Sequence, residues 1–199
     1  MRTLVVATTN QGKLREIREL LSDLPIDVKT LSDFAPVAAP DETGSTFAEN
    51  AQLKALYYAA ATGVMTVAED SGLEIDAMGG APGVQSARYG GEESTYPEKF
   101  ALIYGALAAA GVDTSPARFV CALAVADAGS VCFEARGTIE GQIAPAPRGE
   151  GGFGYDPIFF YPPFGCTLAE VGSRKSAVSH RGEAFRAFKA WLVARGDRP

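Results

Sequence analysis

The stretch TLVVATTNQGKLREIRELL, residues 3–21, joins an apolar run to a helical pattern. Residues 3–8 are typical of a short buried strand, and the apolar positions after them recur every three or four residues, which is helical spacing. These positions are Leu14, Ile17, Leu20, Leu21 and Leu24. The stretch therefore predicts a strand, a short loop and a helix.

A second helix is predicted from its capping residues. Thr46 and Glu49 have the Thr-x-x-Glu spacing of a capping box, an alanine-rich run continues to Ala61, and Gly63 follows as a helix terminator. Residues 64–68 are an apolar run typical of a buried strand. The order of strand, helix and strand is thus repeated.

The second half of the chain adds a hairpin and two helices. A helix is predicted from about residue 95 to 110, β-rich runs at 118–126 and 131–137 flank a hairpin turn, and a last helix covers about 180–194. Because strands and helices alternate early and a hairpin follows, we expect an α/β fold with a mixed, twisted β-sheet flanked by helices. The length of 199 residues fits a single domain, residues 1–199, in which the hairpin projects as a second lobe.

Composition and charge exclude several classes of protein. The formal net charge of −6 argues against a nucleic-acid polymer as partner, because such binding depends on many lysine and arginine contacts to phosphate. Three cysteines without CxxC spacing predict neither a disulfide framework nor a zinc site, and they fit a reducing cytoplasm. The N-terminal apolar run is too short for a signal peptide or a membrane span, so we expect a cytoplasmic protein without a membrane partner.

The loop between the first strand and the first helix is a candidate phosphate site. Unpaired backbone N–H groups and the positive end of the helix dipole favour an anion there, and Lys13 adds a positive charge. The candidate residues are Thr8, Thr9, Asn10, Gln11, Gly12 and Lys13. The spacing is not that of a Walker motif, and an alternative interpretation is that Asn10 only caps the helix while Gly12 eases the turn.

Acidic side chains and a lysine form a second candidate group. Glu42 lies in a loop and Lys54 on the helix after it, so a carboxylate and an amine are available to a metal and a phosphate. The alternative is that both are solvated surface residues. Glu69 and Asp70 follow the strand predicted at 64–68. Because ligands of open α/β sheets collect at the carboxyl ends of strands, this position favours metal binding or general base catalysis.

Glycines, aromatic rings and basic side chains form a third candidate group in the last third of the chain. Residues 151–157, GGFGYDP, let the backbone approach a flat ligand that stacks on a ring, and the basic side chains after them suit oxygen acceptors. The candidates are Phe153, Gly154, Tyr155, Asp156, Lys175, His180 and Arg181. Ordinary core packing is the alternative for the aromatic rings, and a structural role is the alternative for the histidine. A serine nucleophile is disfavoured, because Ser71 lacks a Gly-x-Ser-x-Gly elbow and the single histidine is distant in sequence.

Seven motifs in this order resemble one family. They are Thr8-Thr9-Asn10-x-x-Lys13, Glu42-Thr43-Gly44, Phe47-x-Glu49-Asn50-Ala51-x-x-Lys54-Ala55, Asp70-Ser71-Gly72-Leu73, Gly79-Gly80-Ala81-Pro82-Gly83, residues 151–157, and Ser179-His180-Arg181-Gly182. Together they resemble the inosine triphosphate pyrophosphatase family, in its bacterial dITP/XTP pyrophosphatase branch. The match is collinear from Val5 to the last predicted helix.

The resemblance implies hydrolysis of XTP, ITP and dITP to the nucleoside monophosphate and pyrophosphate. It also implies a homodimer, a substrate cleft between two lobes, and magnesium, with manganese as its substitute, held by Glu42 and Asp70. Asp70 would in addition activate water, and Lys13 and Lys54 would be the other catalytic residues. The implied substrate contacts are made by Thr8, Thr9, Asn10, Gln11, Gly12, Lys13, Ser71, Phe153, Gly154, Tyr155, Asp156, Lys175, His180 and Arg181.

Two positions depart from the pattern of this family, and two other functions stay open. Thr9 stands where many relatives carry glycine, and Glu69 stands where many carry a second aspartate, which leaves open which carboxylate dominates metal binding. One alternative is a pyrophosphatase that prefers a different altered base or a pyrimidine. The other is a regulator that binds nucleotides without hydrolysing them.

Overall fold

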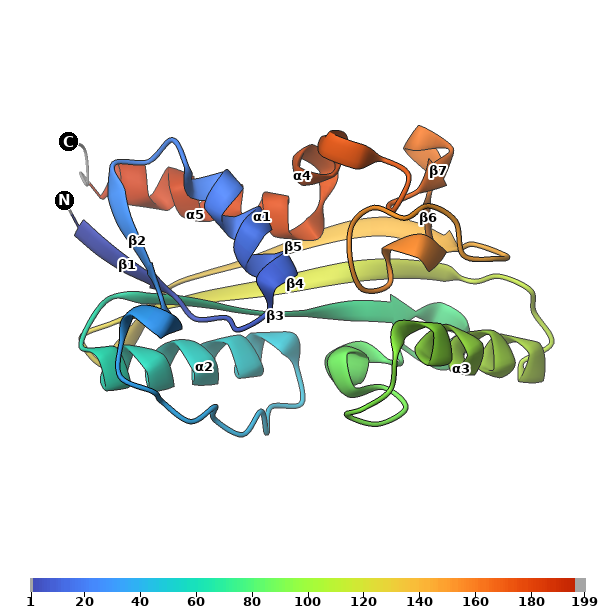
Figure 1. The fold of residues 1–199 in the computed structure, drawn as a ribbon, viewed down its shortest axis with the longest axis horizontal. Helices are drawn as coiled ribbons and strands as arrows, with labels where there is room; N and C mark the ends of the chain where they lie inside the picture. The colour runs from blue at the N-terminus through green and yellow to red at the C-terminus, as the bar shows by residue number, and fades with distance from the viewer. Residues whose placement is uncertain (1, 196–199) are drawn as a thin grey trace. The chain divides into compact units, whose positions relative to one another are not determined.

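The structure is a computed structural model that describes residues 2–195 (Figure 1). Over this range seven strands form a sheet in the order β2-β1-β3-β4-β5-β6-β7. The strands are β1 (Arg2–Val6), β2 (Ile26–Thr30), β3 (Thr66–Ile75), β4 (Pro116–Asp127), β5 (Ser130–Ile143), β6 (Phe159–Tyr161) and β7 (Cys166–Thr167). Strand β1 pairs in parallel with β2 and β3, whereas β6 pairs antiparallel with β5 and β7. The predicted α/β fold with a mixed sheet is confirmed.

The α-helices begin close to the residues at which the sequence predicts them. Those described within residues 2–195 are α1 (Gln11–Leu21), α2 (Phe47–Thr62), α3 (Tyr96–Ala109), α4 (Lys175–Val178) and α5 (His180–Ala194). The side chain of Asn10 caps α1, accepting a hydrogen bond of 3.1 Å from a backbone N–H of the first turn. Thr46 with Glu49, and Thr95 with Glu98, form capping boxes that start α2 and α3. Local side-chain chemistry therefore fixes where these helices begin.

Strand β3 is longer than the sequence predicts. The strand was expected to end before Glu69, but its ten residues, Thr66–Ile75, continue through Glu69 and Asp70. Gly72 lets Ser86 pack closely against the strand, because a Cβ at that position would overlap the side chain of Ser86. The apolar residues beyond Gly72 are buried, so the pattern of a strand resumes after the polar pair. The expectation that the two carboxylates lie at a strand end was therefore wrong: they lie within β3.

The predicted hairpin is formed by β4 and β5. Its turn contains Ala128 and Gly129, whose φ values of 49° and 81° are both positive. Two consecutive residues of positive φ are typical of the tight turns that match the twist of paired strands. Both strands extend beyond the predicted 118–126 and 131–137, to Pro116–Asp127 and Ser130–Ile143.

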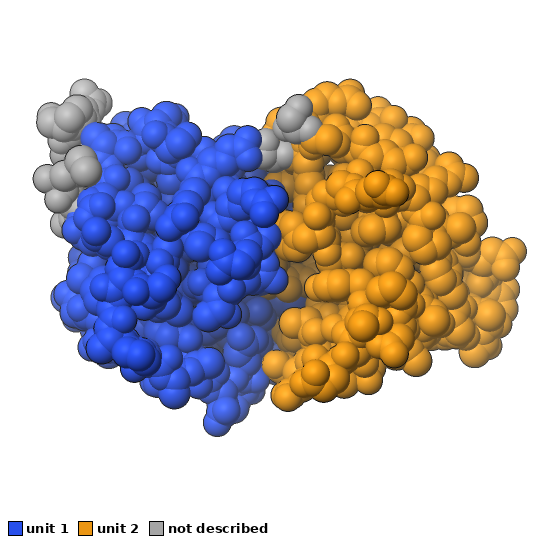
Figure 2. Space-filling view, viewed as in Figure 1, with its two compact units in different colours: residues 1–70, 121–137, 180–199 blue, residues 71–120, 138–179 orange. Residues whose placement is uncertain are grey.

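The chain divides into two compact units, each with an apolar core of its own (Figure 2). The first unit contains residues 1–70, 121–137 and 180–199, drawn in blue, and the second contains residues 71–120 and 138–179, drawn in orange. In the first unit, buried side chains of α1 and α5 pack with those of β1 and β3 in one core. In the second unit, buried side chains of α3 pack with those of β5 and β6. The single domain in two lobes stays a prediction.

The capping box of α2 gives the first testable prediction. Thr46 Oγ1 accepts a hydrogen bond of 3.1 Å from the Glu49 backbone N–H, and Glu49 Oε2 accepts one of 3.2 Å from the Thr46 N–H. Replacing Thr46 by alanine should lower the free energy of unfolding by about 1 kcal/mol, because the helix loses its side-chain cap. Urea unfolding followed by circular dichroism measures this change. Thr46→Ser keeps the hydroxyl and should unfold like the parent, and equal stability of the alanine and serine variants would contradict the assignment of the cap.

Candidate active site

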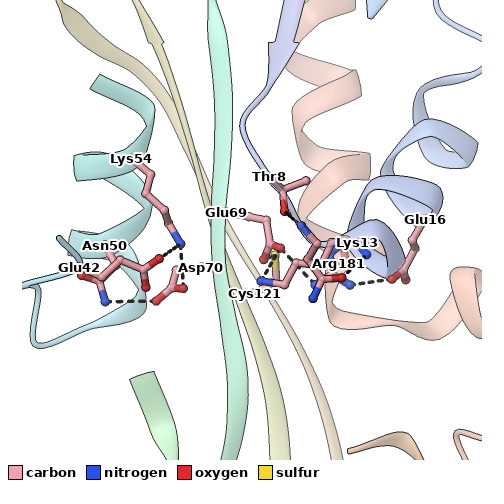
Figure 3. A network of polar contacts seen from close by, with 11 residues as sticks. Thr8, Lys13, Glu16, Glu42, Asn50, Lys54, Glu69, Asp70, Cys121 and Arg181 are labelled. Carbon is pink, nitrogen blue, oxygen red and sulfur yellow. Dashed lines mark hydrogen bonds and ion pairs between the residues drawn. The ribbon is translucent and has the colours of Figure 1, made fainter. Parts of the chain in front are cut away.

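Glu69 and Asp70 are neighbours on β3 and point to its two opposite faces (Figure 3). Successive side chains of a strand alternate between faces, so this arrangement follows directly from their sequence positions. Figure 3 shows Asp70 on the side of α2 and Glu69 on the side of α1 and α5. Asp70 is 6% exposed and Glu69 is 4% exposed. Buried carboxylates need polar or charged partners to remain ionised. Each therefore has its own cluster of polar partners.

The first cluster, which we call the Asp70 cluster, joins Asp70 to Glu42, Asn50 and Lys54. Lys54 Nζ lies 3.0 Å from Asp70 Oδ1 and 3.1 Å from Glu42 Oε1. Asn50 Nδ2 donates a hydrogen bond of 3.2 Å to Asp70 Oδ2. Asn50 and Lys54 lie one turn apart on the same side of α2. The predicted grouping of Glu42, Lys54 and Asp70 is thus present in the structure, and they are more than separate solvated side chains.

The buried amide of Asn50 also fixes the loop that carries Glu42. Its Oδ1 accepts a hydrogen bond of 2.8 Å from the backbone N–H of Gly44. A side chain at Gly44 would overlap Asn50 and Glu49, so only glycine lets the loop approach the helix this closely. Through Asn50 the Glu42 loop and Asp70 are therefore tied to one helix.

The second cluster, which we call the Glu69 cluster, joins Glu69 to Lys13, Arg181, Glu16 and Cys121. Glu69 Oε1 lies 2.9 Å from Lys13 Nζ and 3.3 Å from Arg181 Nη2. Glu69 Oε2 accepts a hydrogen bond from Cys121 Sγ at 3.4 Å. The guanidinium of Arg181 also pairs with Glu16, with Nη1 2.6 Å from Oε2. Lys13 and Asp70 are thus held by different carboxylate clusters, on the two faces of β3 (Figure 3).

The pKa values of these groups show how burial and charge compete. Burial raises the pKa of Asp70, and the positive charge of Lys54 offsets this only in part. Burial also opposes the charge of Lys54, but Asp70 and Glu42 outweigh it and raise the pKa of the ammonium. Burial would likewise raise the pKa of Glu69, yet Arg181 and Lys13 outweigh it and hold that pKa well below its usual range.

The two clusters interact electrostatically across β3. Burial raises the pKa of Asp70, and the charge of Lys13 offsets a small part of that rise; Glu69 adds to the larger effects of Asp70 and Glu42 that raise the pKa of Lys54. Both effects require the charges to lie within the range of Coulomb interaction in a medium of low polarity. The two clusters therefore form one electrostatic system although their side chains lie on different faces of the strand.

The loop before α1 is held by its own polar groups and leaves several of them accessible. Thr8 Oγ1 accepts a hydrogen bond of 3.2 Å from the Asn10 backbone N–H, and Asn10 caps the helix. Thr9, Asn10 and Gln11 are exposed, while Thr8, Gly12 and Lys13 are half-buried. The capping interpretation of Asn10 is confirmed. It does not exclude an anion, because further N–H groups of the first helical turn remain available to one.

Asp156 organises the predicted aromatic group in the second unit. Its Oδ2 accepts hydrogen bonds from Lys175 Nζ at 2.6 Å and from the Phe153 backbone N–H at 2.8 Å. Lys175 Nζ also lies 4.4 Å from the centroid of the Phe153 ring. Gly154, with a φ of 70°, continues the turn between these residues in a conformation that favours glycine. The structure thus brings together Phe153, Gly154, Asp156 and Lys175.

Tyr155, unlike Phe153, packs in a core. It is 4% exposed, and its ring meets those of Tyr96 and Phe100 at centroid distances of 5.3 Å and 6.1 Å. Its hydroxyl donates a hydrogen bond of 2.8 Å to the carbonyl of Ser86. The core-packing interpretation is therefore confirmed for this ring. Ser71 is half-buried, next to Asp70 on β3.

Three buried residues were missed by sequence reasoning or assigned differently. Glu16 and Cys121, which complete the Glu69 cluster, were not predicted. Glu16 is the one acidic residue among the buried positions of α1. An acidic residue close to the apolar side of a predicted helix is the sequence signal that could have indicated a buried ion pair. Arg181 was predicted to contact the base, whereas the structure shows it 1% exposed and paired with two carboxylates. His180 is also buried, at the start of α5.

Comparison with known proteins agrees with the motifs and the fold. The model of the Ham1 family matches residues 4–191, nearly the whole chain. The protein belongs to the Ham1 family. Two relatives, both named dITP/XTP pyrophosphatase, come from Thermus thermophilus, at 48% identity over 98% of this chain and 93% of that protein, and from Exiguobacterium sibiricum, at 45% identity over 96% of each. The resemblance predicted from the seven motifs is confirmed.

Solved structures of Ham1 proteins have the same fold. The HAM1 protein from Coxiella burnetii is 41% identical, with a TM-score of 0.90 over 98% of this chain and all of that one. The Ham1 protein from Staphylococcus aureus is 35% identical, with a TM-score of 0.87 over 99% of this chain. Likenesses of this extent over full-length chains place the mixed sheet and its helices within the architecture of the Ham1 family.

The Asp70 cluster offers two carboxylates to a divalent metal ion. Glu42 and Asp70 direct carboxylate oxygens at one position, now taken by the Lys54 ammonium. Magnesium in nucleotide enzymes is bound through one or two carboxylates, and takes its other ligands from water and phosphate. Within residues 2–195 no group of three or more His, Cys, Asp or Glu side chains is arranged to hold a metal. A two-carboxylate site completed by the substrate is compatible with that finding.

No helix in the described part of the chain is both long enough and apolar enough to cross a membrane.

Proposed function

We propose that this Ham1 protein hydrolyses altered purine nucleoside triphosphates, namely ITP, XTP and dITP, to the nucleoside monophosphate and pyrophosphate. The observation that carries this function is the Asp70 cluster, in which Lys54 Nζ lies 3.0 Å from a carboxylate oxygen of Asp70 and 3.1 Å from one of Glu42. The names of the relatives support the choice of substrate. In the reaction, water attacks the α-phosphorus, the bond to the bridging oxygen of the β-phosphate breaks, and pyrophosphate leaves.

The residues of the first unit divide the catalytic work. Glu42 and Asp70 would hold magnesium, which when bound supplies positive charge to the phosphates. Asp70 orients the attacking water and accepts its proton. Lys54 and Lys13 neutralise the charge of the triphosphate, since charge neutralisation and positioning are the main help that phosphoryl transfer can receive.

Residues 8–13 are proposed to bind the phosphates at the start of α1. The exposed loop, the first N–H groups of the helix and Lys13 together offer hydrogen-bond donors and positive charge. Manganese is proposed as a substitute for magnesium, because both accept carboxylate and phosphate oxygens in octahedral geometry.

Recognition of the base is proposed for Ser71, Phe153, Gly154, Asp156, Lys175 and His180, while the buried Tyr155 and Arg181 support these residues from the interior of their own units. Inosine and xanthine carry a carbonyl oxygen at position 6, whereas adenine carries an amino group. Donors directed at that position would leave an amino group and themselves unpaired, at a cost of about 1–3 kcal/mol for each buried group. Lys175 is a hydrogen-bond donor in this set that also contacts an aromatic face. Its ammonium lies between the Asp156 carboxylate and the Phe153 ring.

A homodimer in the cytoplasm is part of the same proposal. Gel filtration with light scattering would measure the mass of the assembly. A monomer at the concentration of the activity assay would contradict the homodimer but not the proposed reaction.

Pyrophosphate release from purified protein tests the proposed reaction. We expect ITP, XTP and dITP to be cleaved in the presence of magnesium, and ATP, GTP and dUTP to be cleaved much more slowly. EDTA should abolish release, and added magnesium should restore it. Binding of ITP without release would indicate a regulator instead. Faster release from dUTP would indicate a pyrophosphatase with another base preference.

A further inference from the structure

Cys121 is a buried thiol beside the candidate site. It lies on β4, the neighbour of β3 in the sheet, and its side chain has no solvent exposure. Its sulfur points at the Glu69 carboxylate, with Sγ 3.4 Å from Oε2 (Figure 3). The thiol therefore contacts the oxygen of Glu69 that Lys13 and Arg181 do not use.

The two oxygens of Glu69 have different partners. Oε1 takes the ammonium of Lys13 at 2.9 Å and the guanidinium of Arg181 at 3.3 Å, while Oε2 takes the thiol. Burial raises the pKa of the Cys121 thiol well above its usual value, and the charge of Glu69 adds to this effect. At neutral pH the thiol keeps its proton and acts as a hydrogen-bond donor.

The terminal torsion of a glutamate side chain is soft, so a carboxylate turns easily unless both oxygens are engaged. Without a donor at Oε2, Glu69 is free to present both oxygens to the cations around it. Lys13 would then be held more tightly by Glu69, and its charge would be less available to a bound phosphate. A weak neutral donor at Oε2 prevents this without competing with the cations.

We propose that Cys121 is a positioning residue of the reaction, which acts through Glu69 to set the place and the availability of the Lys13 ammonium. The inference rests on the proposed function, in which Lys13 neutralises the triphosphate. Because the thiol has no solvent exposure, it would act through Glu69 and not by touching the substrate. Its surroundings explain why a small, largely apolar donor suits the position, because it packs in the core of the first unit with Val67 and Leu123.

The chain offers a matched control in Cys132. This second cysteine lies on β5 in the same unit, is half-buried, and also donates its thiol at 3.4 Å, in this case to the backbone carbonyl of Val125. Its acceptor carries no charge and belongs to neither cluster. Cys132→Ala therefore removes a thiol hydrogen bond of equal length without disturbing Glu69.

The test measures kcat and KM for ITP in Cys121→Ala, Cys121→Ser and Cys132→Ala, each alone and in a Lys13→Ala background. We expect Cys121→Ala to lower kcat/KM roughly fivefold, the factor that corresponds to one modest hydrogen bond, mainly through a higher KM. Cys121→Ser restores a donor and should stay within about twofold of the parent, as should Cys132→Ala. In the Lys13→Ala background, Cys121→Ala should change kcat/KM by less than about twofold, because the ammonium that the thiol positions is absent.

Three results would overturn the inference. They are an equal loss from Cys121→Ala with and without Lys13, a serine variant as impaired as the alanine variant, and the same loss from Cys132→Ala. A parent protein that does not cleave ITP would instead contradict the proposed function. In that case calorimetric titration of the same variants with inorganic pyrophosphate measures the availability of the Lys13 charge directly. Weaker binding by Cys121→Ala, restored in Cys121→Ser, supports the inference, and unchanged binding overturns it.

Discussion

Asp70→Asn should lower kcat for ITP by about 100-fold or more, the scale of loss when a general base is removed. The amide has nearly the shape of the carboxylate but accepts no proton from water and carries no charge for a metal. Asn50 Nδ2 and Lys54 Nζ both donate to Asp70, so the amide nitrogen of the variant must face one donor and lose that bond. Lys54 keeps its ion pair with Glu42, and the fold should therefore persist. Initial rates of pyrophosphate release, with circular dichroism of both proteins, measure the two effects.

Asp23→Asn is the matched control for this substitution. Asp23 also forms an ion pair with a lysine, Lys189 Nζ at 2.6 Å, but its side chain is 67% exposed. Exposed pairs contribute little, so this variant should show the kcat of the parent. A folded Asp70→Asn protein with undiminished turnover would remove Asp70 from the role of base. The choice between Glu69 and Asp70 would then have to be reopened.

The helices and the Asp70 cluster could be predicted because their causes are local or lie in short motifs. Thr46 and Glu49 satisfy the N–H groups at the start of α2, whatever the rest of the chain does. Asn50 and Lys54 share one side of that helix, and Gly44 lets the loop that carries Glu42 approach the helix. Grouping Glu42 and Lys54 with Asp70 rested on the family resemblance, and the contacts of Lys54 bear the grouping out.

The division of the site between two faces of β3 was not predicted, because it depends on how far the strand continues. If the strand ended before Glu69, as expected, Glu69 and Asp70 could both face one ligand. Within a continuous strand they must alternate, and each then needs separate partners. The partners of Glu69 come from α1, β4 and α5, brought together only by the packing of the first unit. Nothing in the local sequence of Cys121 shows that its thiol will meet a carboxylate 52 positions earlier in the chain.

Arg181→Ala should destabilise the protein by about 3–5 kcal/mol, the cost of breaking a buried ion pair from one side. Arg181 is 1% exposed and pairs with both Glu16 and Glu69, whose side chains are 10% and 2% exposed. Its loss leaves the buried carboxylates without the guanidinium that offsets their desolvation. Urea unfolding at pH 7 measures the change. Any loss of ITP turnover in this variant must therefore be read beside its stability before it is assigned to base recognition.

Surface Arg118 provides the comparison that separates burial from the number of partners. It lies within 3.7 Å of Glu74, 2.9 Å of Asp76 and 3.2 Å of Glu140, yet its side chain is 26% exposed. Arg118→Ala should lower the free energy of unfolding by about 1 kcal/mol or less, since water screens these pairs.

The dependence of stability on acid pH is a second test of the Arg181–Glu69 pair. The lowered pKa of Glu69 stabilises the fold above the ordinary glutamate pKa of about 4.3, and this contribution is lost as the pH falls through the lowered value. The stability gap between the parent and Arg181→Ala should therefore narrow in acid, and a constant gap, or a loss no larger than that of Arg118→Ala, would show that the Glu69 pair does not stabilise the fold.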